Sequence, residues 1–429
     1  MLLIKNGRVV DPASGTDSIL DVLIDGDRIV STGAKLEASK KQTSPVEVID
    51  ATGWIVAPGF IDLHCHLREP GQEISETIET GTRAAARGGF TAVCAMPNTQ
   101  PVNDNAAVTR SIVDRAARSA SVRVWPVGAA SLGSRGESLA EIGAMRDAGI
   151  VAVSDDGKPI ANARLLRQIM EYCAGLNLPV MEHCEDASLF AGGVMREGPR
   201  SVRLGLRGIP AESESICAGR DVEMAGLTGA RLHVCHLSAG RTLDHVRAAK
   251  KSGLPVTCEV TPHHFTLTDE DVSYNTRFKM NPPLGSRDDR EALLAGLADG
   301  AVDAIATDHA PHHPASKEVE FDRAPFGVTG FETALALAID ELFHTGRLSL
   351  PRLVELFTTG PGRVLGVEDN RRLVEGGLAD LTLFSLDSLW TFRAAESASR
   401  SRNSPFDGRQ FRGAPMATIV AGRIAWRRS

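Results

Sequence analysis

The chain has 429 residues, of which 42% are hydrophobic and 24% are charged, and its formal net charge is -7. This length exceeds one small domain and is typical of a large barrel with an accessory domain, or of two domains. The negative charge argues against nucleic acid or an anionic membrane as a partner, and the sequence has no apolar run long enough to span a bilayer.

The cysteine usage indicates a reducing compartment. The seven cysteines have no CxxC spacing, and several lie inside apolar runs. This pattern favours buried, reduced thiols over a disulfide framework. The first residues, Met1 to Gly7, lack the apolar core of a signal peptide and enter a strand-like alternation at once. We therefore expect a cytoplasmic protein.

Both ends of the chain have the pattern of short β-strands. Residues 1–54 contain alternating apolar stretches separated by Asn-Gly and Asp-Gly pairs, which favour hairpins, and residues 35–45 form a polar stretch typical of an exposed loop. Residues 376–384 and 415–426 again have strand patterns. We expect segments 1–54 and 371–429 to pair into one small β-sandwich domain.

Between these ends, residues 55–370 repeat a strand, loop and helix pattern. The eight strand candidates are residues 55–63, 90–96, 122–127, 150–154, 179–182, 231–235, 255–260 and 302–307. Helical patterns between them cover residues 78–87, 105–117, 139–148, 162–174, 215–227, 242–251 and 287–297. Eight such units predict a (β/α)8 barrel, whose active site forms at the C-terminal ends of the strands.

The first strand candidate ends in a pair of histidines. Alternate side chains of a strand point the same way, so His64 and His66 face one side and Cys65 the other. Arg68 has the same parity as the histidines, if the strand continues that far. An isolated His-x-His pair is a weak signal of a metal site, so the interpretation depends on what the other strands place at the same rim.

The other strand candidates supply such partners. Asn98 follows the second strand, and the remaining candidates end later strands: Asp155 and Asp156, His183, His236 and Asp308. Imidazoles and carboxylates together suit zinc, with manganese or cobalt as substitutes. In such a site one carboxylate could bridge two metals and a second could move a proton. This arrangement suits the hydrolysis of an amide or phosphoester.

Several assignments stay open at this level. Alternation does not choose between Asp155 and Asp156 as a ligand. His183, taken alone, fits a histidine of the barrel core equally well, whereas His233 falls on the face opposite His236. The other histidines are interpreted as structural or supporting groups (His263 and His264) or as polar surface and loop residues (His245, His309, His313 and His344).

Two long motifs resemble the signatures of the dihydroorotase family. Residues 62–70, Asp-Leu-His-Cys-His-Leu-Arg-Glu-Pro, match the first signature, and residues 306–312, Ala-Thr-Asp-His-Ala-Pro-His, with Lys317 five residues on, match the second. The stretches at residues 79–86, 96–99, 154–157, 280–284 and 325–327 look like the type I bacterial branch. The resemblance covers nearly the whole chain and is weakest in residues 30–48.

The resemblance implies a metal-dependent amidohydrolase barrel and a role for each matching residue. Zinc, one or two ions per subunit, would be held by His64, His66 and Asp308 and by His183 and His236, with Asp156 as the bridging carboxylate. His66 would also contact the substrate, whose carboxylate would be bound by Arg68, Asn98 and His312. Its ring amides would face Asn281 and the backbone of Phe326 and Gly327, and Asp308 would move the proton. Because the fourth strand ends in Ser-Asp-Asp-Gly, no carboxylated lysine is expected, and Lys158 lies off the motif.

The implied activity is the reversible interconversion of (S)-dihydroorotate and N-carbamoyl-L-aspartate in de novo pyrimidine (UMP) synthesis. One alternative is another cyclic amidohydrolase, an allantoinase or hydantoinase. A second is a catalytically dead subunit that scaffolds aspartate transcarbamoylase, against which the complete set of ligands argues. We further expect a homo-oligomer, a dimer, and consider a complex with aspartate transcarbamoylase, although no docking surface is visible in the sequence.

Overall fold

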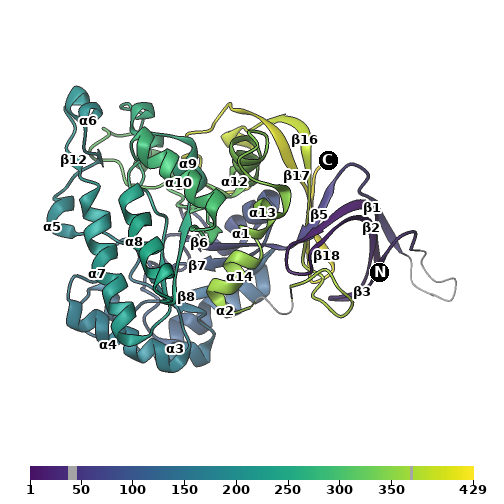
Figure 1. Ribbon diagram of the computed structural model, residues 1–429, viewed down its shortest axis with the longest axis horizontal. Coiled ribbons are helices and arrows are strands. Elements are labelled where there is room, and N and C mark those ends of the chain that lie inside the picture. The colour runs from purple at the N-terminus through teal and green to yellow at the C-terminus, as the bar shows by residue number, and fades with distance from the viewer. Residues whose placement is uncertain (37–45, 368–370) are drawn as a thin grey trace.

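The computed structural model describes residues 1–36, 46–367 and 371–429. A barrel wrapped by helices lies beside a β layer that contains both ends of the chain (Figure 1). The polar stretch predicted at residues 35–45 falls almost wholly outside the described residues, and so does the predicted domain boundary near residue 370. None of the described helices is both long enough and apolar enough to cross a membrane.

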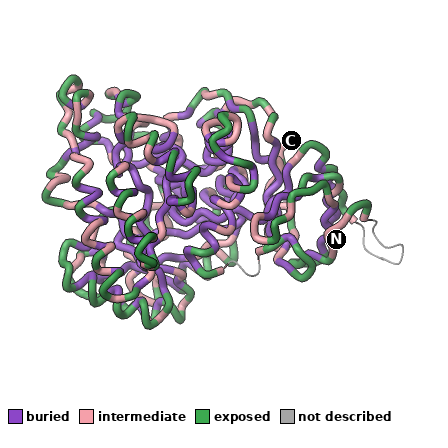
Figure 2. The backbone as a smooth tube through the Cα atoms, in the orientation of Figure 1, coloured by how far each residue is buried: buried purple, intermediate pink, exposed green. Residues whose placement is uncertain are grey.

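The predicted barrel is confirmed. Eight parallel strands follow one another in chain order around it: β6 (Phe60–Cys65), β7 (Phe90–Ala95), β8 (Arg123–Gly128), β9 (Ala152–Val153), β10 (Val180–Glu182), β13 (Leu232–Val234), β14 (Val256–Val260) and β15 (Ala304–Ile305). Most residues of these strands are buried, and the tube in Figure 2 is coloured as buried through the interior of the barrel.

The first and last strands of the barrel meet through individual contacts. Cys65 and His309 form an isolated parallel bridge. The carboxylate of Asp62 accepts hydrogen bonds from the backbone N–H of Thr307, at 2.7 Å, and from its hydroxyl, at 2.6 Å. These bonds hold the end of β15 beside β6, so His64 and Asp308, far apart in sequence, lie at one rim.

Helices cover the outer face of the barrel. The longer ones are α1 (Ile78–Gly88), α2 (Ala106–Ser119), α3 (Ile142–Ala148), α4 (Ala163–Leu176), α7 (Glu212–Thr228), α8 (Gly240–Lys251), α10 (Arg287–Asp299) and α12 (Phe331–Ala338). The shorter ones are α5 (Ala187–Phe190), α6 (Pro199–Leu204), α9 (Pro262–Thr266), α11 (Pro314–Lys317), α13 (Leu350–Glu355) and α14 (Thr359–Leu365). Local sequence sets their ends: a capping box of Thr77 and Thr80 precedes α1, and Gly89, whose φ is 94°, caps its C-terminus.

Strands from both ends of the chain form the predicted β domain. They are β1 (Leu2–Asp11), β2 (Thr16–Asp25), β3 (Arg28–Gly33), β4 (Glu47–Asp50), β5 (Ile55–Pro58), β16 (Leu381–Thr391), β17 (Gln410–Val420) and β18 (Arg423–Arg427). One mixed sheet joins them, with β5 between β1 and β16 and β4 paired to β1. A single apolar cluster contains residues from both ends of the chain, for example Ile4 and Val22 together with Leu381 and Ile419.

The first strand candidate, residues 55–63, is two strands. Its first part, β5, belongs to the terminal sheet, whereas β6 belongs to the barrel, and Gly59 separates them. A Cβ at Gly59 would lie 2.7 Å from Cγ2 of Thr91 on β7, so the close passage of the chain here needs glycine. The chain therefore passes directly from the terminal sheet into the barrel.

Candidate active site

Four histidines and two aspartates gather at the C-terminal rim of the barrel. His64, near the end of β6, has its Nε2 3.3 Å from Oδ1 of Asp156 and 3.7 Å from Oδ1 of Asp308. His66 Nε2 lies 3.2 Å from the same Asp308 oxygen. Cys65 points the other way, where its thiol donates to the carbonyl of Cys94 at 3.2 Å. The alternation predicted for this stretch is thus confirmed.

A second group meets the first at Asp156. The Oδ1 of Asp156 lies 3.6 Å from His236 Nε2 and 3.8 Å from His183 Nδ1, and these two nitrogens are 3.0 Å apart. Asp156 is therefore shared between the pair His64 and His66 and the pair His183 and His236. The structure brings together all six residues predicted as metal ligands.

The structure also separates Asp155 from Asp156. Asp155 accepts hydrogen bonds from the backbone N–H groups of Ala130, at 2.9 Å, and Ser131, at 3.1 Å, and from the Ser131 hydroxyl. It therefore supports the loop after β8, while Asp156 lines the cavity. Burial opposes ionisation of Asp156, but the neighbouring imidazoles, His64 foremost, hold the pKa of this carboxyl well below its usual range.

This donor set fits metal cations. His64 is fully buried, and its ring nitrogens make no well-formed hydrogen bond among the described residues, although the carboxylates of Glu259 and Asp156 lie 3.4 and 3.3 Å from them. Nδ1 of His236 also has no hydrogen-bond partner among these residues. Buried polar atoms without hydrogen bonds are unfavourable. A cation bound between Nε2 of His64 and the two aspartates would provide that nitrogen with a partner. Burial lowers the pKa of His236, which favours the neutral imidazole that a metal requires. Mixed imidazole and carboxylate ligands suit zinc or a similar divalent ion.

Strained backbone occurs at this rim. Asp308 has a φ of 43° and His236 a φ of 33°, in the left-handed region that side chains with a Cβ avoid. Such conformations cost on the order of 1–3 kcal/mol and cluster at functional sites. In this chain they direct a carboxylate and an imidazole into one cavity.

Two glutamates that the sequence analysis did not single out orient the histidines. Glu259 on β14 has Oε1 3.4 Å from His64 Nδ1 and Oε2 3.1 Å from His233 Nε2. Glu185 has Oε2 3.6 Å from His183 Nε2. Carboxylates behind metal-ligating histidines fix the ring orientation. The signal for Glu259 was present in the sequence, since it is the one charged residue of a short, mostly apolar strand.

A cavity of about 230 Å³ opens beside the histidines and aspartates. Its lining includes the predicted substrate-binding residues His66, Arg68, Asn98, Asn281, His312, Phe326 and Gly327, together with Asp156, His183, His236 and Asp308. His64 is not among the lining residues, because it lies deeper in the barrel. Every residue assigned to the substrate is thus in contact with one hollow.

Arg68 reaches the cavity by a different route from the one predicted. β6 ends at Cys65, and Arg68 has a φ of 61°, so strand parity does not place it. Its Nε donates to the carbonyl of Pro311 at 3.1 Å, and burial lowers its pKa to about 10, so it stays a cation at neutral pH. His312 is held differently: burial lowers its pKa to about 3, and the neutral ring donates from Nε2 to the carbonyl of Phe326 at 2.6 Å.

Polar side chains link the cavity wall to the ligands. Asn98 donates from Nδ2 to Asp156 Oδ2 at 3.2 Å, and its Oδ1 lies 2.8 Å from His66 Nδ1. Asn281 donates to Glu185 Oε2 at 2.8 Å, and its Nδ2 lies 3.2 Å from His183 Nε2. A change at either asparagine therefore acts on the ligands as well as on the cavity.

One assignment of a surface histidine is wrong. His309 is buried: its ring stacks on Phe331 with centroids 4.1 Å apart, and its Nε2 lies 3.4 Å from Oε2 of Glu76. The pairing with Glu76, which is distant in sequence, could not be seen from local pattern.

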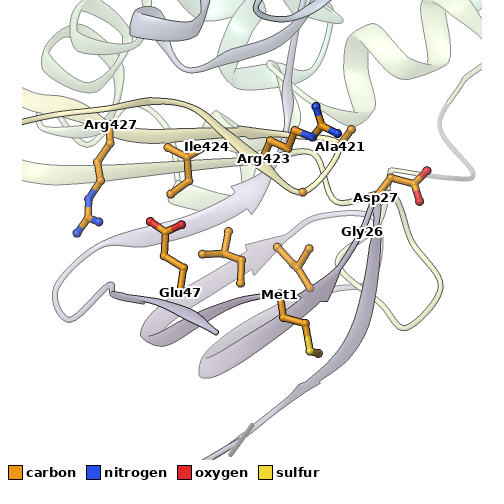
Figure 3. A pocket seen from close by; sticks show the side chains of 11 residues that line it. Met1, Gly26, Asp27, Glu47, Ala421, Arg423, Ile424 and Arg427 are labelled. Atoms are coloured by element: carbon orange, nitrogen blue, oxygen red, sulfur yellow. The ribbon is translucent and has the colours of Figure 1, made fainter. Parts of the chain in front are cut away.

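A larger hollow of about 860 Å³ lies in the terminal sheet (Figure 3). It is lined by Asp27, Glu47, Arg423 and Arg427 with apolar and backbone groups of the sheet, and by none of the predicted site residues. Next to Glu47 the chain enters residues outside the described range. The chemistry is therefore assigned to the smaller cavity at the barrel rim.

Fold and site together define a metal-binding hydrolase barrel of the amidohydrolase kind, and comparison with known proteins specifies the family. Residues 53–241 match the family model described as "Dihydro-orotase-like". The chain is 54% identical over 428 residues to a dihydroorotase of Solibacter usitatus, covering 100% of this chain and 98% of that protein. It is 49% identical to a dihydroorotase of Anaeromyxobacter dehalogenans, covering 99% and 97%. The chain therefore belongs to the dihydroorotase family.

Solved structures support the same architecture. The L-hydantoinase (dihydropyrimidinase) from Arthrobacter aurescens superimposes with a TM-score of 0.88 at 25% identity, covering 99% of this chain and 95% of that one. The dihydropyrimidinase from Brevibacillus agri gives a TM-score of 0.84 at 23% identity, covering 99% and 95%. The barrel and its flanking β domain are thus an arrangement that also occurs in these hydantoinase and dihydropyrimidinase structures.

Proposed function

We propose that the protein is a zinc-dependent dihydroorotase that interconverts (S)-dihydroorotate and N-carbamoyl-L-aspartate in the cytoplasmic synthesis of UMP. Membership of the family supports the reaction. The observation that carries the proposal is one cavity that holds the guanidinium of Arg68 beside the cluster of histidines and aspartates. A cation fixed next to metal ligands suits a substrate that has both a carboxylate and a cyclic amide.

The substrate carboxylate is assigned to Arg68, Asn98 and His312. Because Nε of Arg68 is engaged by Pro311, its terminal nitrogens remain for a two-pronged contact with a carboxylate. The ring amides are assigned to Asn281 and to the backbone of Phe326 and Gly327, which line the other part of the cavity. In this pose the substrate ring lies between Arg68, which binds its carboxylate, and Asn281, which binds its amides. The part of the cavity near Asn281, Phe326 and Gly327 is called the amide-binding end below.

The metal ligands are assigned in two sets. His64, His66 and Asp308 would hold one zinc ion, His183 and His236 a second, and Asp156 would bridge them; their mutual distances of 3.0–3.8 Å support this grouping. When bound, the metals would supply an activated water and polarise the ring carbonyl. Lys158 is exposed and does not line the cavity, which supports a carboxylate rather than a modified lysine as the bridge.

Asp308 is assigned the proton transfer. Its carboxylate borders the cavity, and the imidazoles around it, His66 foremost, hold its pKa below the usual range against the effect of burial. It is therefore ionised at the start of the reaction, and we assign to it the transfer of the proton from the attacking water to the leaving ring nitrogen. Synthesis of the ring follows the same steps in reverse.

An assay with three substrates tests the proposal. Dihydroorotate, allantoin and hydantoin are offered side by side, and product is measured before and after chelation and after zinc is restored. We expect turnover of dihydroorotate that chelation abolishes and zinc restores. Preference for allantoin or hydantoin would identify the other cyclic amidohydrolase, and inactivity with all three at full zinc content would favour the scaffold subunit.

The assembly state is a further proposal. We expect a homodimer, and we retain a complex with aspartate transcarbamoylase as a partner hypothesis. Light scattering of the protein alone, and then mixed with that transcarbamoylase, measures both. A monomeric mass would contradict the dimer, and an unchanged mass on mixing would contradict the complex.

A further inference from the structure

Two buried lysines lie behind the amide-binding end of the cavity. Lys317 ends α11 and belongs to the second motif, and Lys279 lies two residues before Asn281. Lys317 is 7% exposed and Lys279 2% exposed, and neither is among the residues that line the cavity. The roles proposed above leave both lysines unused.

Both ammonium groups donate to backbone carbonyls. Nζ of Lys317 donates to Pro325 at 2.7 Å, to Thr276 at 3.2 Å and to Lys279 at 3.2 Å, which uses all three of its N–H groups. Nζ of Lys279 donates to Phe321 at 2.8 Å and to Asp322 at 2.9 Å. These five bonds join segment 276–279 to segment 321–325.

The aromatic side chain at the cavity is tied to the same lysine. Nζ of Lys279 lies 4.7 Å from the ring centroid of Phe326 and 5.7 Å from that of Phe321. A cation over an aromatic face is attracted by the ring, more strongly when both are removed from water. Lys279 therefore orders the side chain of Phe326 as well as the backbone before it.

This arrangement is unfavourable for a charge. Burial lowers the pKa of Lys317 to about 7 and that of Lys279 to about 8. Among the described residues, both ammonium groups bond backbone carbonyls rather than carboxylates, and the charge of Asp322 offsets only part of the effect of burial on Lys279. A buried ammonium without a carboxylate partner is poorly compensated, so apolar side chains would fill the same space at lower cost. What the ammonium groups add is directed bonds to five carbonyls.

Those carbonyls lie next to the groups assigned to the substrate ring. The N–H of Gly327 donates to the carbonyl of Lys279 at 3.0 Å, and the carbonyl of Phe326 accepts from His312. Gly327 has a φ of 129°, and a Cβ there would lie 2.7 Å from the Cβ of Ala310, so the backbone has little room to shift. Lys317 donates to the carbonyl of Pro325, the residue before Phe326, and Lys279 lies two residues before Asn281.

We propose that Lys279 and Lys317 are positioning residues, which hold segments 276–281 and 321–327 at a fixed separation and so set the affinity of the cavity for the substrate ring. This inference rests on the proposed function, because it specifies how the amide-binding end of the same cavity is built. The lysines themselves contact no metal ligand, whereas Asn281, at the end of the first segment, lies 3.2 Å from His183. We therefore expect the lysines to act more strongly on substrate binding than on metal binding.

Steady-state kinetics of Lys317→Met and Lys279→Met test the inference. Methionine keeps most of the volume and removes the N–H donors. We expect KM for dihydroorotate to rise at least about tenfold, since a displacement near 1 Å of a binding group has effects of that size or larger. We expect kcat to stay within about threefold and metal content to be unchanged, because neither lysine contacts a metal ligand directly.

The matched control is Lys251→Met, which removes an exposed lysine at the end of α8 and should leave KM unchanged. Lys317→Arg retains a cation and donors in a different geometry, so it should restore KM only partly. A KM within twofold of wild type in both methionine variants would overturn the inference. A loss of kcat and metal content at unchanged KM would do the same, since it would indicate a general folding role.

Hydrogen exchange separates this inference from the proposed function. In the methionine variants, the amides of residues 321–327, Gly327 above all, should exchange faster than in wild type and in Lys251→Met, with or without substrate. Unchanged exchange in this segment contradicts the positioning role even if dihydroorotate is turned over. Failure of wild type to use dihydroorotate contradicts the function, while the exchange data still decide the role of the lysines.

Discussion

His64 illustrates how single residues of the site are held. Its ring lies inside the barrel with Glu259 behind Nδ1 at 3.4 Å and two aspartates in front of Nε2 at 3.3 and 3.7 Å. The carboxylate behind fixes the ring, so Nε2 already points to where a cation would bind. The same logic applies to His183 with Glu185. The site is therefore preorganised by residues that do not face the substrate.

Replacing Asp308 by asparagine should separate chemistry from binding. The amide keeps the shape but cannot accept the proton, so we expect kcat to fall by about 10²–10⁴, while KM changes by less than about threefold. Because Asp308 is also assigned as a metal ligand, kinetics should be measured with saturating zinc and with metal content determined in parallel. A fully metallated variant with near wild-type kcat would remove Asp308 from the proton transfer.

Replacing Arg68 by lysine should act mainly on binding. Lysine keeps the charge but cannot form the two-pronged contact, and its amine cannot also donate to Pro311 from the same position. We expect KM for dihydroorotate to rise about 10- to 100-fold with a smaller change in kcat. Metal content, measured in parallel, is the control and should not change, because Arg68 is not among the assigned ligands. An unchanged KM for dihydroorotate would refute the carboxylate assignment.

At the scale of elements, sequence periodicity predicted the positions of the candidate ligands better than it predicted how the strands join into sheets and which turns connect them. Eight strand patterns, and the ligands at their ends, were sufficient to place His64, His183, His236 and Asp308 at one rim, because parallel strands in a barrel end together. Periodicity does not record which sheet a strand joins, so the division at Gly59 was not visible. It also could not reveal the left-handed turn that brings Arg68 to the cavity.

The sequence also did not predict the side-chain contacts between elements that are distant in the chain. The pairings of Glu259 with His64 and of Glu76 with His309 join residues far apart in the chain, and no local pattern encodes them. The choice of Asp156 over Asp155 needed the family spacing, because both follow the same short strand. In the structure, hydrogen bonds from Ala130 and Ser131 hold Asp155 away from the cavity.

The passage between the two sheets at Gly59 should be sensitive to a methyl group. Gly59→Ala would press a Cβ against Thr91, whose hydroxyl donates to the carbonyl of Phe60 at 3.2 Å, so we expect a loss of about 1–3 kcal/mol in the free energy of unfolding. Gly175→Ala in α4 is the matched control, because no atom lies within 4 Å of its Cβ position. That helical substitution should stabilise by about 0.5–1 kcal/mol. Urea unfolding measures both, and equal effects would contradict the role of Gly59.

For the whole molecule, the site connects elements from all around the barrel. Its candidate ligands come from the ends of β6, β9, β10, β13 and β15. At the seam between β6 and β15, the described residues are joined by an isolated bridge and by individual hydrogen bonds rather than by a continuous ladder. A metal bound there would link the first strand to the last and add to the bonds between Asp62 and Thr307. Metal binding should therefore stabilise the barrel as a unit, apart from its effect on catalysis.

Chelation should accordingly lower both activity and thermal stability. A metal present at about 1,000 times its Kd stabilises the folded state by about 4 kcal/mol, which for a chain of this length corresponds to about 5 °C in Tm. We expect dialysis against a chelator to remove the activity and to lower Tm by that order, and zinc to restore both, whereas magnesium should not, because it binds imidazole poorly. His183→Ala, which removes one ligand of the second set, should show a smaller fall in Tm on chelation. A chelator that abolished activity with no change in Tm would contradict a metal link across the seam, because the ion would then be bound without joining β6 to β15.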